Sequence, residues 1–207
     1  MSRRIALIDS GVNAAHPHLR EGVRVELGPK VSSSGELLPA SQQRDVIGHG
    51  TAAAAAVADL CPDAELYSVQ VFEDRSSCPF EHLMLALDQA LEWRPEILNL
   101  SLGTTRRDFA DGWTSFLARA AEQGTQVVSP AAWQGLPSFP GSLDGATGVL
   151  MDARLERHKP ELRENGTHRC WYASPYPREL PGLPRDSNLV GVSMACANVT
   201  GFLASGT

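Results

Sequence analysis

Short runs of hydrophobic residues alternate along the chain with stretches of helical spacing, and this alternation restricts the fold more than any other feature. Residues 5–8, 65–72, 97–100 and 126–128 have the pattern of strands. A continuous apolar run is typical of a strand that is covered on both faces, as in a parallel sheet. Where strands and helices take turns, the strands run parallel and helices cover both faces of the sheet. We therefore predict an α/β fold in a single domain, residues 1–207.

Four helices are expected between and after these strands. Their ranges are residues 50–60, 80–93, 109–122 and 193–204. The first contains the run Ala52 to Ala56, whose small side chains allow a helix to pack close to a sheet. Pro95 ends the second, because proline disfavours helix in the residue before it. Gly124 is in the usual position to close the third.

The pattern weakens between residues 135 and 185. We expect a further strand within 145–155, whereas 156–166 is charged and 174–184 is rich in proline. Long surface connections are the favoured interpretation of the last two segments, and a rim that contacts substrate is the alternative.

The composition excludes several classes of partner. Hydrophobic residues make up 43% of the 207 residues, enough for a buried core, and the net charge of −6 argues against a nucleic-acid partner, which needs a basic surface. No apolar run approaches the ~20 residues that span a bilayer, so no membrane partner is expected. Cys61, Cys78, Cys170 and Cys196 lack the spacing of metal ligands and are predicted to be free thiols. We predict no metal and no cofactor.

An acidic residue follows the first predicted strand, in the triplet Asp9-Ser10-Gly11. Ligands of open parallel sheets bind beyond the carboxyl ends of the strands, so Asp9 lies where chemistry is expected. It could orient a catalytic histidine, accept a phosphoryl group or contact a ribose. The alternative is a turn residue, with Gly11 making the turn.

Two further motifs lie at the starts of predicted helices. Gly48-His49-Gly50-Thr51 has glycines on both sides of an imidazole, which lets backbone and substrate approach closely, and histidine is a poor helix cap. In Gly191-Val192-Ser193-Met194-Ala195, a serine at a helix start presents its hydroxyl outward and has a free backbone N–H for a developing oxyanion. A plain helix cap is the alternative. A serine hydroxyl needs an adjacent base and an orienting carboxylate to act as a nucleophile, and His49 and Asp9 are candidates for both.

In the order Asp, His, Ser, these motifs resemble the subtilisin-like serine proteases. The segment Ile97-Leu98-Asn99-Leu100-Ser101-Leu102-Gly103 is similar to the substrate-lining strand of that family, and the segment from Ser193 to Gly201 is similar to its nucleophile helix. The resemblance implies a three-layer subtilisin-like fold of reduced size, with a mostly parallel sheet flanked by helices. It also implies roles for particular residues: Ser193 as nucleophile, His49 as general base and then general acid, Asp9 as the carboxylate that orients the imidazole, and Ser101, Leu102 and Gly103 as peptide-binding residues.

The chain departs from the family at the oxyanion hole, where the family has an asparagine side chain. Alignment on the preceding valines and Gly135 puts Trp133 at that position, whereas alignment on the two alanines puts Gln134 there. Either side chain has an N–H donor that could act together with the Ser193 N–H. The alternative is that Trp133 only shapes a pocket wall. Near the nucleophile, Ala197 and Asn198 stand where the family has proline and histidine, and Cys196 is expected to be a packed thiol.

The sequence has no room for an export signal or pro-domain before its first predicted strand, which favours a cytoplasmic protein. We therefore predict a narrow-specificity endopeptidase that removes a leader segment from a precursor peptide. One candidate precursor is the γ-subunit of quinohemoprotein amine dehydrogenase. Two other functions compete: a pseudo-protease that grips an extended peptide along Ser101–Gly103 without cutting it, and a signalling domain phosphorylated on Asp9. The second is disfavoured because Lys30 and Lys159, the only lysines, lie in predicted loops.

Overall fold

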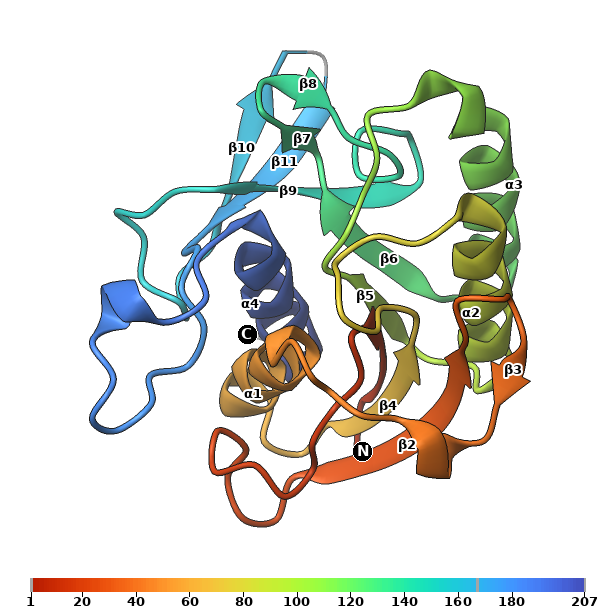
Figure 1. Ribbon diagram of the computed structural model, residues 1–207. Helices are drawn as coiled ribbons and strands as arrows, with labels where there is room; N and C mark the ends of the chain where they lie inside the picture. The colour runs from red at the N-terminus through yellow and green to blue at the C-terminus, as the bar shows by residue number, and fades with distance from the viewer. Residues whose placement is uncertain (1, 167, 207) are drawn as a thin grey trace.

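A nine-stranded sheet forms the centre of the computed structural model, which describes residues 2–166 and 168–206 (Figure 1). The strand order is β10-β11-β9-β6-β5-β1-β4-β2-β3. Neighbouring strands run parallel except at the two edges, where β10 pairs antiparallel with β11 and β3 with β2. The strands are β1 (Arg4–Asp9), β2 (Arg24–Val31), β3 (Leu37–Leu38), β4 (Glu65–Gln70), β5 (Ile97–Leu100), β6 (Gln126–Pro130), β9 (Ala146–Met151), β10 (Glu161–Asn165) and β11 (His168–Ala173). The predicted mostly parallel α/β sheet is confirmed.

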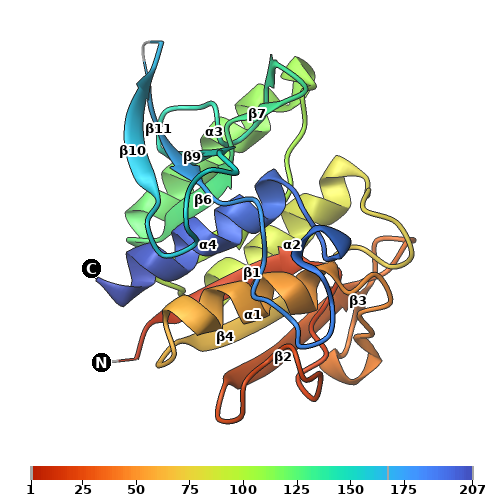
Figure 2. The same ribbon diagram turned by 90° about the vertical axis from the view of Figure 1, so that its left-hand side faces the viewer.

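Four α-helices cover the sheet, two on each face. The helices α1 (His49–Leu60) and α4 (Val192–Ser205) pack on one face, and α2 (Phe80–Glu92) and α3 (Ala110–Glu122) pack on the other (Figure 2). A short hairpin of β7 (Ala132–Trp133) and β8 (Leu136–Pro137) follows β6. Single turns of 3-10 helix lie at Ala40–Gln42, Arg107–Phe109 and Arg185–Ser187. None of the helices within the described residues is long and apolar enough to cross a membrane.

Strand β1 shows how the apolar runs produce the layers. Ile5 and Leu7 belong to the core under α1 and α4, whereas Ala6 and Ile8 belong to the core under α2 and α3, and all four are fully buried. Side chains of a strand alternate between its two faces, so an uninterrupted apolar run is buried on both.

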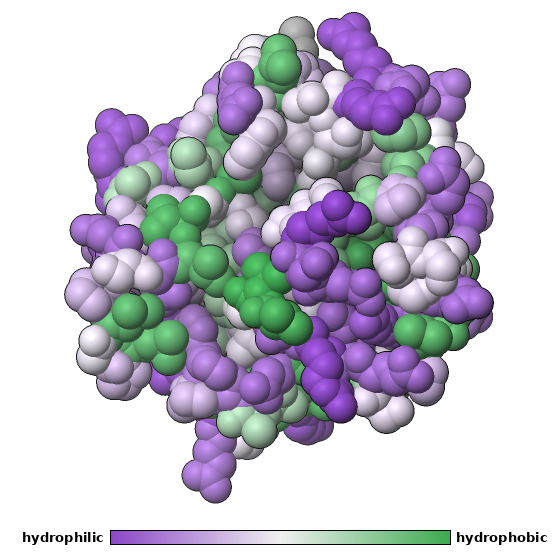
Figure 3. All heavy atoms as spheres, viewed as in Figure 1, coloured by the Kyte–Doolittle hydropathy of each residue, from purple (hydrophilic) through white to green (hydrophobic). Residues whose placement is uncertain are grey.

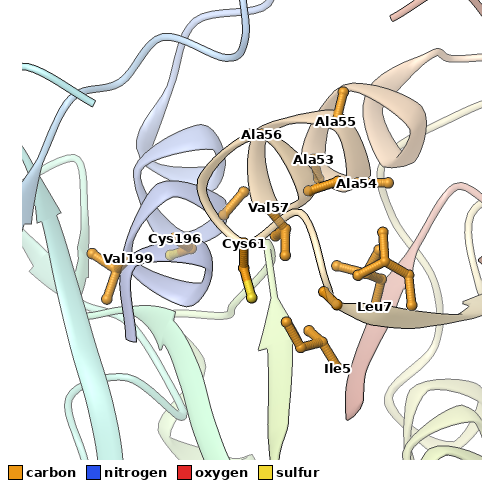
Figure 4. Close-up of a cluster of buried hydrophobic side chains, with 14 of the residues drawn as sticks. Ile5, Leu7, Ala53, Ala54, Ala55, Ala56, Val57, Cys61, Cys196 and Val199 are labelled. Carbon is orange, nitrogen blue, oxygen red and sulfur yellow. The ribbon is translucent and has the colours of Figure 1, made fainter. Parts of the chain in front are cut away.

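Small residues allow α1 and α4 to lie very close together. The alanines of α1 are buried against the sheet and against α4, whose Cys196 and Val199 point toward the same core (Figure 4). A Cβ at Gly201 would lie only 2.8 Å from the carbonyl oxygen of Val57. This close packing fixes the position of α4 relative to α1.

The structure differs from the sequence prediction at several elements. Strands β2, β10 and β11 were not predicted, and β10 falls within 156–166, which was interpreted as surface connection. Only two of the eight residues of β2 are buried and none of the five of β10, so their sequences lack the apolar run that marks a buried strand. Lys30, predicted in a loop, lies in β2, and its Nζ is 2.5 Å from Glu73 Oε1.

The cysteine prediction is confirmed. Cys61, Cys78, Cys170 and Cys196 are all free, and all but the half-buried Cys78 are buried. Burial raises the pKa of the Cys196 thiol well above its usual value, as expected for a packed thiol rather than a reactive one.

Candidate active site

The carboxyl end of the central strand β1 and the first turns of α1 and α4 meet at the same end of the sheet. Asp9 is the last residue of β1, His49 is the first residue of α1, and Ser193 lies in the first turn of α4. Gly191 rather than Ser193 precedes the helix as its cap, so Ser193 is one position further into α4 than predicted. The three residues are 40 and 144 positions apart in the chain, and the fold brings all three together.

The three side chains form one line of hydrogen bonds. His49 Nδ1 lies 2.7 Å from Asp9 Oδ1 and 2.9 Å from Asp9 Oδ2, and His49 Nε2 lies 2.9 Å from Ser193 Oγ. A carboxylate only accepts hydrogen bonds, so Nδ1 carries the ring proton and donates a hydrogen bond to Asp9. Nε2 is then left as an acceptor for the hydroxyl of Ser193. This arrangement can remove a proton from the hydroxyl and return it to another group.

The surroundings make the imidazole a stronger base. Burial on its own would lower the pKa of His49, but the charge of Asp9, the hydrogen bond to Asp9 and the charge of Asp45 together outweigh it, and the pKa is raised above 6.5. Asp9 is 1% exposed, so the surrounding water screens its charge poorly.

Asp45 is a functional candidate that the sequence reasoning missed. Its Oδ1 accepts hydrogen bonds from Ser10 Oγ at 2.7 Å and from the Gly48 N–H at 2.8 Å. Its Oδ2 accepts from the Thr51 N–H at 2.8 Å and from the Thr51 hydroxyl. An acid a few residues before a predicted helix start is the sequence signal that could have found it, because a negative charge is stabilised at a helix N-terminus.

Two glycines allow the first strand to approach α1. A Cβ at Gly50 would lie 2.1 Å from the carbonyl oxygen of Gly11, and Gly11 itself has φ +93°. The Gly50 N–H donates to Ser10 Oγ at 2.9 Å. The glycines on either side of the motifs therefore set the distance between Asp9 and His49.

A cavity of about 640 Å³ opens beside Ser193. His49, Ser193 and the three predicted peptide-binding residues Ser101, Leu102 and Gly103 all line it. On the face drawn in Figure 3, hydrophobic side chains gather around a hollow near the middle. The Ser101 hydroxyl donates to the Ser193 carbonyl at 3.0 Å, which joins this wall to the first turn of α4. In the described part of the chain, the N–H groups of Leu102 and Gly103, just beyond the end of β5, have no hydrogen-bond partner, as expected of backbone that is free to pair with a peptide.

The two oxyanion candidates occupy different places. Trp133 lines the cavity and is 56% exposed, whereas Gln134 lies in the tight turn of the β7–β8 hairpin with φ +50° and is not part of the cavity wall. Across residues 2–166 and 168–206, the Ser193 N–H has no hydrogen-bond partner. It is one of the donors that a helix leaves unpaired in its first turn.

The hydrogen bonds of Asn198 explain why this chain has an asparagine at that position. It is fully buried, its amide donates to the carbonyl oxygens of Ser174 and Tyr176 at 2.9 Å each, and its side-chain oxygen accepts from Arg157 Nε at 3.1 Å. These bonds tie α4 to the segment that leads into Gly191. Among the described residues, no three His, Cys, Asp or Glu side chains are grouped so that they could hold a metal ion.

Comparison with known proteins shows the family of the chain. Residues 3–135, which include Asp9 and His49 but not Ser193, match the Subtilase family, Peptidase_S8. A subtilisin of Bacillus sp. (strain TA39) is 30% identical over 188 residues, which cover 80% of this chain and 41% of that protein. A thermostable alkaline protease of Halalkalibacterium halodurans is 31% identical over 97% of this chain and 55% of its own length. The chain thus spans about half the length of these relatives or less.

Solved structures share the fold. The prenylagaramide maturation protease PagA has a TM-score of 0.70 at 21% identity, with 96% of this chain and 73% of PagA covered. A lanthipeptide protease has a TM-score of 0.68 at 18% identity and covers 98% of this chain and 72% of its own. A cold-adapted subtilisin-like serine proteinase has a TM-score of 0.70 at 18% identity and covers 97% and 73%. With the family match extending over more than half of its residues, the chain belongs to the subtilase family, and it has the subtilisin-like fold.

Proposed function

We propose that this chain is a serine endopeptidase in which Ser193 is the nucleophile, His49 the general base and acid, and Asp9 the orienting carboxylate. The observation that carries the proposal is the unbroken line of hydrogen bonds from Asp9 through His49 to Ser193, with lengths of 2.7 and 2.9 Å. The subtilase membership of the chain supports the same assignment.

The reaction follows from the direction of those bonds. Ser193 Oγ attacks the peptide carbonyl carbon while its proton passes to His49 Nε2, and Asp9 stabilises the resulting imidazolium. His49 then gives that proton to the leaving amine, the C–N bond breaks, and an acyl group remains on Ser193. Water repeats the sequence on the acyl-enzyme, with His49 again taking and returning one proton, and the carboxylic acid is released.

The tetrahedral oxyanion needs hydrogen-bond donors beside Ser193. The Ser193 N–H is one, and we assign the second to the indole N–H of Trp133, because Trp133 shares the cavity with Ser193 and Gln134 does not line it. The Trp133 indole N–H has no hydrogen-bond partner within the described residues, so it is available to a substrate. If Trp133 acts only as a wall, the Ser193 N–H serves alone.

The substrate we propose is a precursor peptide from which a leader is removed. Its extended chain would pair with Ser101–Gly103, where the N–H groups of Leu102 and Gly103 are available. PagA, a maturation protease by name, and a lanthipeptide protease share the fold, which supports a peptide-maturation role. The γ-subunit of quinohemoprotein amine dehydrogenase stays one prediction among such precursors, and cytoplasmic location likewise stays a prediction.

The second candidate, a pseudo-protease that binds peptide without cutting it, is favoured by one observation: the segment Ala131-Ala132-Trp133-Gln134-Gly135 contains no asparagine, the residue that the family has in its oxyanion hole. A fluorophosphonate probe separates the two functions, because it reacts only with an activated serine. We expect an adduct on Ser193 of the wild type and none on Ser193→Ala. Mass spectrometry of candidate precursors incubated with both proteins should then reveal a cleavage product with the wild type alone. Peptide binding by both proteins, with neither adduct nor product, would favour the pseudo-protease.

A further inference from the structure

A buried chain of polar side chains connects the middle of α4 with the backbone of Ser193. The Thr200 hydroxyl donates to Asn99 Oδ1 at 2.9 Å, and Asn99 Nδ2 donates to Ser101 Oγ at 2.9 Å. The Ser101 hydroxyl in turn donates to the Ser193 carbonyl oxygen at 3.0 Å. Thr200 and Asn99 are fully buried, so water does not compete for their bonds. The proposed reaction gives neither of these two residues a part.

The three hydrogen bonds run in one direction, from Thr200 toward Ser193. An amide NH₂ group only donates, so the Ser101 oxygen accepts from Asn99 and the Ser101 proton points to the Ser193 carbonyl. Hydrogen bonds in a chain of this kind polarise and strengthen one another. Thr200 supplies the first donor, and this donor favours the orientation in which the amide oxygen of Asn99 faces Thr200 and its NH₂ group faces Ser101.

The position of Thr200 in the helix allows it to start this chain. Thr200 follows Ser193 by seven residues, about two helical turns, so the two residues lie on the same face of α4. Asn99 lies in the central strand β5, which α4 contacts, and Ser101 directly follows the end of that strand. The chain of hydrogen bonds therefore joins α4 to Ser101–Gly103, the segment with which the proposed peptide pairs.

Ser193 is held from two sides. Its hydroxyl oxygen lies 2.9 Å from His49 Nε2, and its carbonyl oxygen lies 3.0 Å from Ser101 Oγ. In the proposed reaction, on which this inference rests, Ser193 Oγ must reach the carbonyl carbon of a peptide bound in the cleft. We propose that Thr200 is a positioning residue for this attack. Acting through Asn99 and Ser101, its hydroxyl holds the first turn of α4 at the distance from the peptide-binding segment that the attack requires.

Thr200→Val tests this role, because valine keeps the shape of threonine and removes only the hydroxyl. The amide of Asn99 then loses the partner that orients it, and the Ser101 hydroxyl is free to turn away from the Ser193 carbonyl. The second-order rate of inactivation by a small fluorophosphonate reports on Ser193 without requiring a known substrate. We expect this rate to fall about tenfold, since a misplacement of about 1 Å costs about 100-fold and this one is smaller.

Thr125→Val is the matched control, since it removes a buried threonine hydroxyl at the opposite end of the sheet. The Thr125 hydroxyl donates to the Pro95 carbonyl at 2.7 Å, just before the first residues of β6 and β5. Both valine variants should lose similar stability in urea unfolding, but only Thr200→Val should react more slowly with the fluorophosphonate. Thr200→Ser keeps the hydroxyl and should return the rate close to that of the wild type. The pH midpoint of inactivation should not move in any of these variants, because no charge changes.

Equal rates for Thr200→Val and Thr125→Val would overturn the assignment. So would a slow rate in Thr200→Ser, or a moved pH midpoint, which would place the effect on His49. If Thr200→Val does not fold, Thr200→Ala gives the same comparison, because alanine also removes the hydroxyl and favours helix. If the wild type reacts with the fluorophosphonate but the comparison fails, the role of Thr200 alone is refuted. If the wild type does not react, the proposed function is refuted together with it.

Discussion

Asp45 has two expected effects, one on the stability of the first turn of α1 and one on the basicity of His49. Replacing Asp45 by asparagine should change both, and a separate assay measures each. The carboxylate accepts four hydrogen bonds, two on each oxygen, from Ser10, Gly48 and Thr51. It also contributes to the raised pKa of His49 through its charge. The amide keeps the shape and one acceptor oxygen but removes the charge.

The size of the stability effect follows from the number of bonds lost. In the asparagine variant the NH₂ group faces the Thr51 N–H, which loses its acceptor, while the Thr51 hydroxyl can rotate and accept. One bond lost, together with the repulsion of two facing donors, corresponds to about 1–2 kcal/mol of unfolding free energy. Asp45→Ala loses all four bonds and should cost about 2–4 kcal/mol. Urea unfolding followed by circular dichroism measures both.

The effect on His49 is measured by the pH dependence of fluorophosphonate inactivation. Inactivation requires neutral His49 as the base, so its rate rises with pH through the pKa of the free enzyme. Because the pKa of His49 is raised, the wild-type midpoint should lie above pH 6.5. Asp45→Asn removes one cause of the rise, and its midpoint should move to lower pH.

Asp63→Asn is the matched control, since it removes the same charge from an exposed residue just beyond the opposite end of α1. Its inactivation midpoint should equal that of the wild type. A midpoint that stays in place or rises in Asp45→Asn, in a variant that is otherwise folded, would refute the electrostatic role of Asp45.

Four other substitutions test the site and its support. Ser193→Ala should lower cleavage by roughly 10⁶-fold and change the unfolding free energy by no more than about 1 kcal/mol, because Ser193 is not the helix cap; a large loss of stability would contradict this. Trp133→Phe should reduce turnover by about 10²-fold if the indole N–H stabilises the oxyanion, whereas Gln134→Leu should have little effect; the reverse result would assign the donor to Gln134. Gly201→Ala should lower stability by about 1–3 kcal/mol in thermal unfolding, because its Cβ would lie 2.8 Å from the Val57 carbonyl; an unchanged midpoint would show that α1 and α4 can move apart.

The central strands and the helices could be predicted because burial imposes a pattern on their sequences. Strand β5 is buried at all four positions, and its apolar run leaves few alternatives. Helix α3 begins at Ala110, one residue after the predicted start, because a single 3-10 turn precedes it. Gly124, with φ +76°, follows the end of that helix as predicted.

The edge strands could not be predicted because pairing with one neighbour stabilises them without deep burial. Four of the five residues of β10 are exposed, and three of the five are charged. Among the described residues, its only partner in the sheet is β11, through antiparallel hydrogen bonds between backbone groups. Backbone hydrogen bonding is the same for every residue type except proline, so it leaves no pattern in the sequence.

A chemical requirement on residue type explains why Asp9, His49 and Ser193, which the fold brings together, could be proposed from the sequence, whereas Asp45 could not. Proton transfer requires particular chemical groups, and few residue types can replace an imidazole between a carboxylate and a hydroxyl. Stabilising an oxyanion requires only an N–H in the right position, and a backbone amide, an indole or an amide side chain can each supply it. Asp45 acts on His49 through a hydrogen-bonded loop and through its charge, and neither needs a fixed motif. Such residues are therefore found only when the fold shows which groups lie beside the nucleophile.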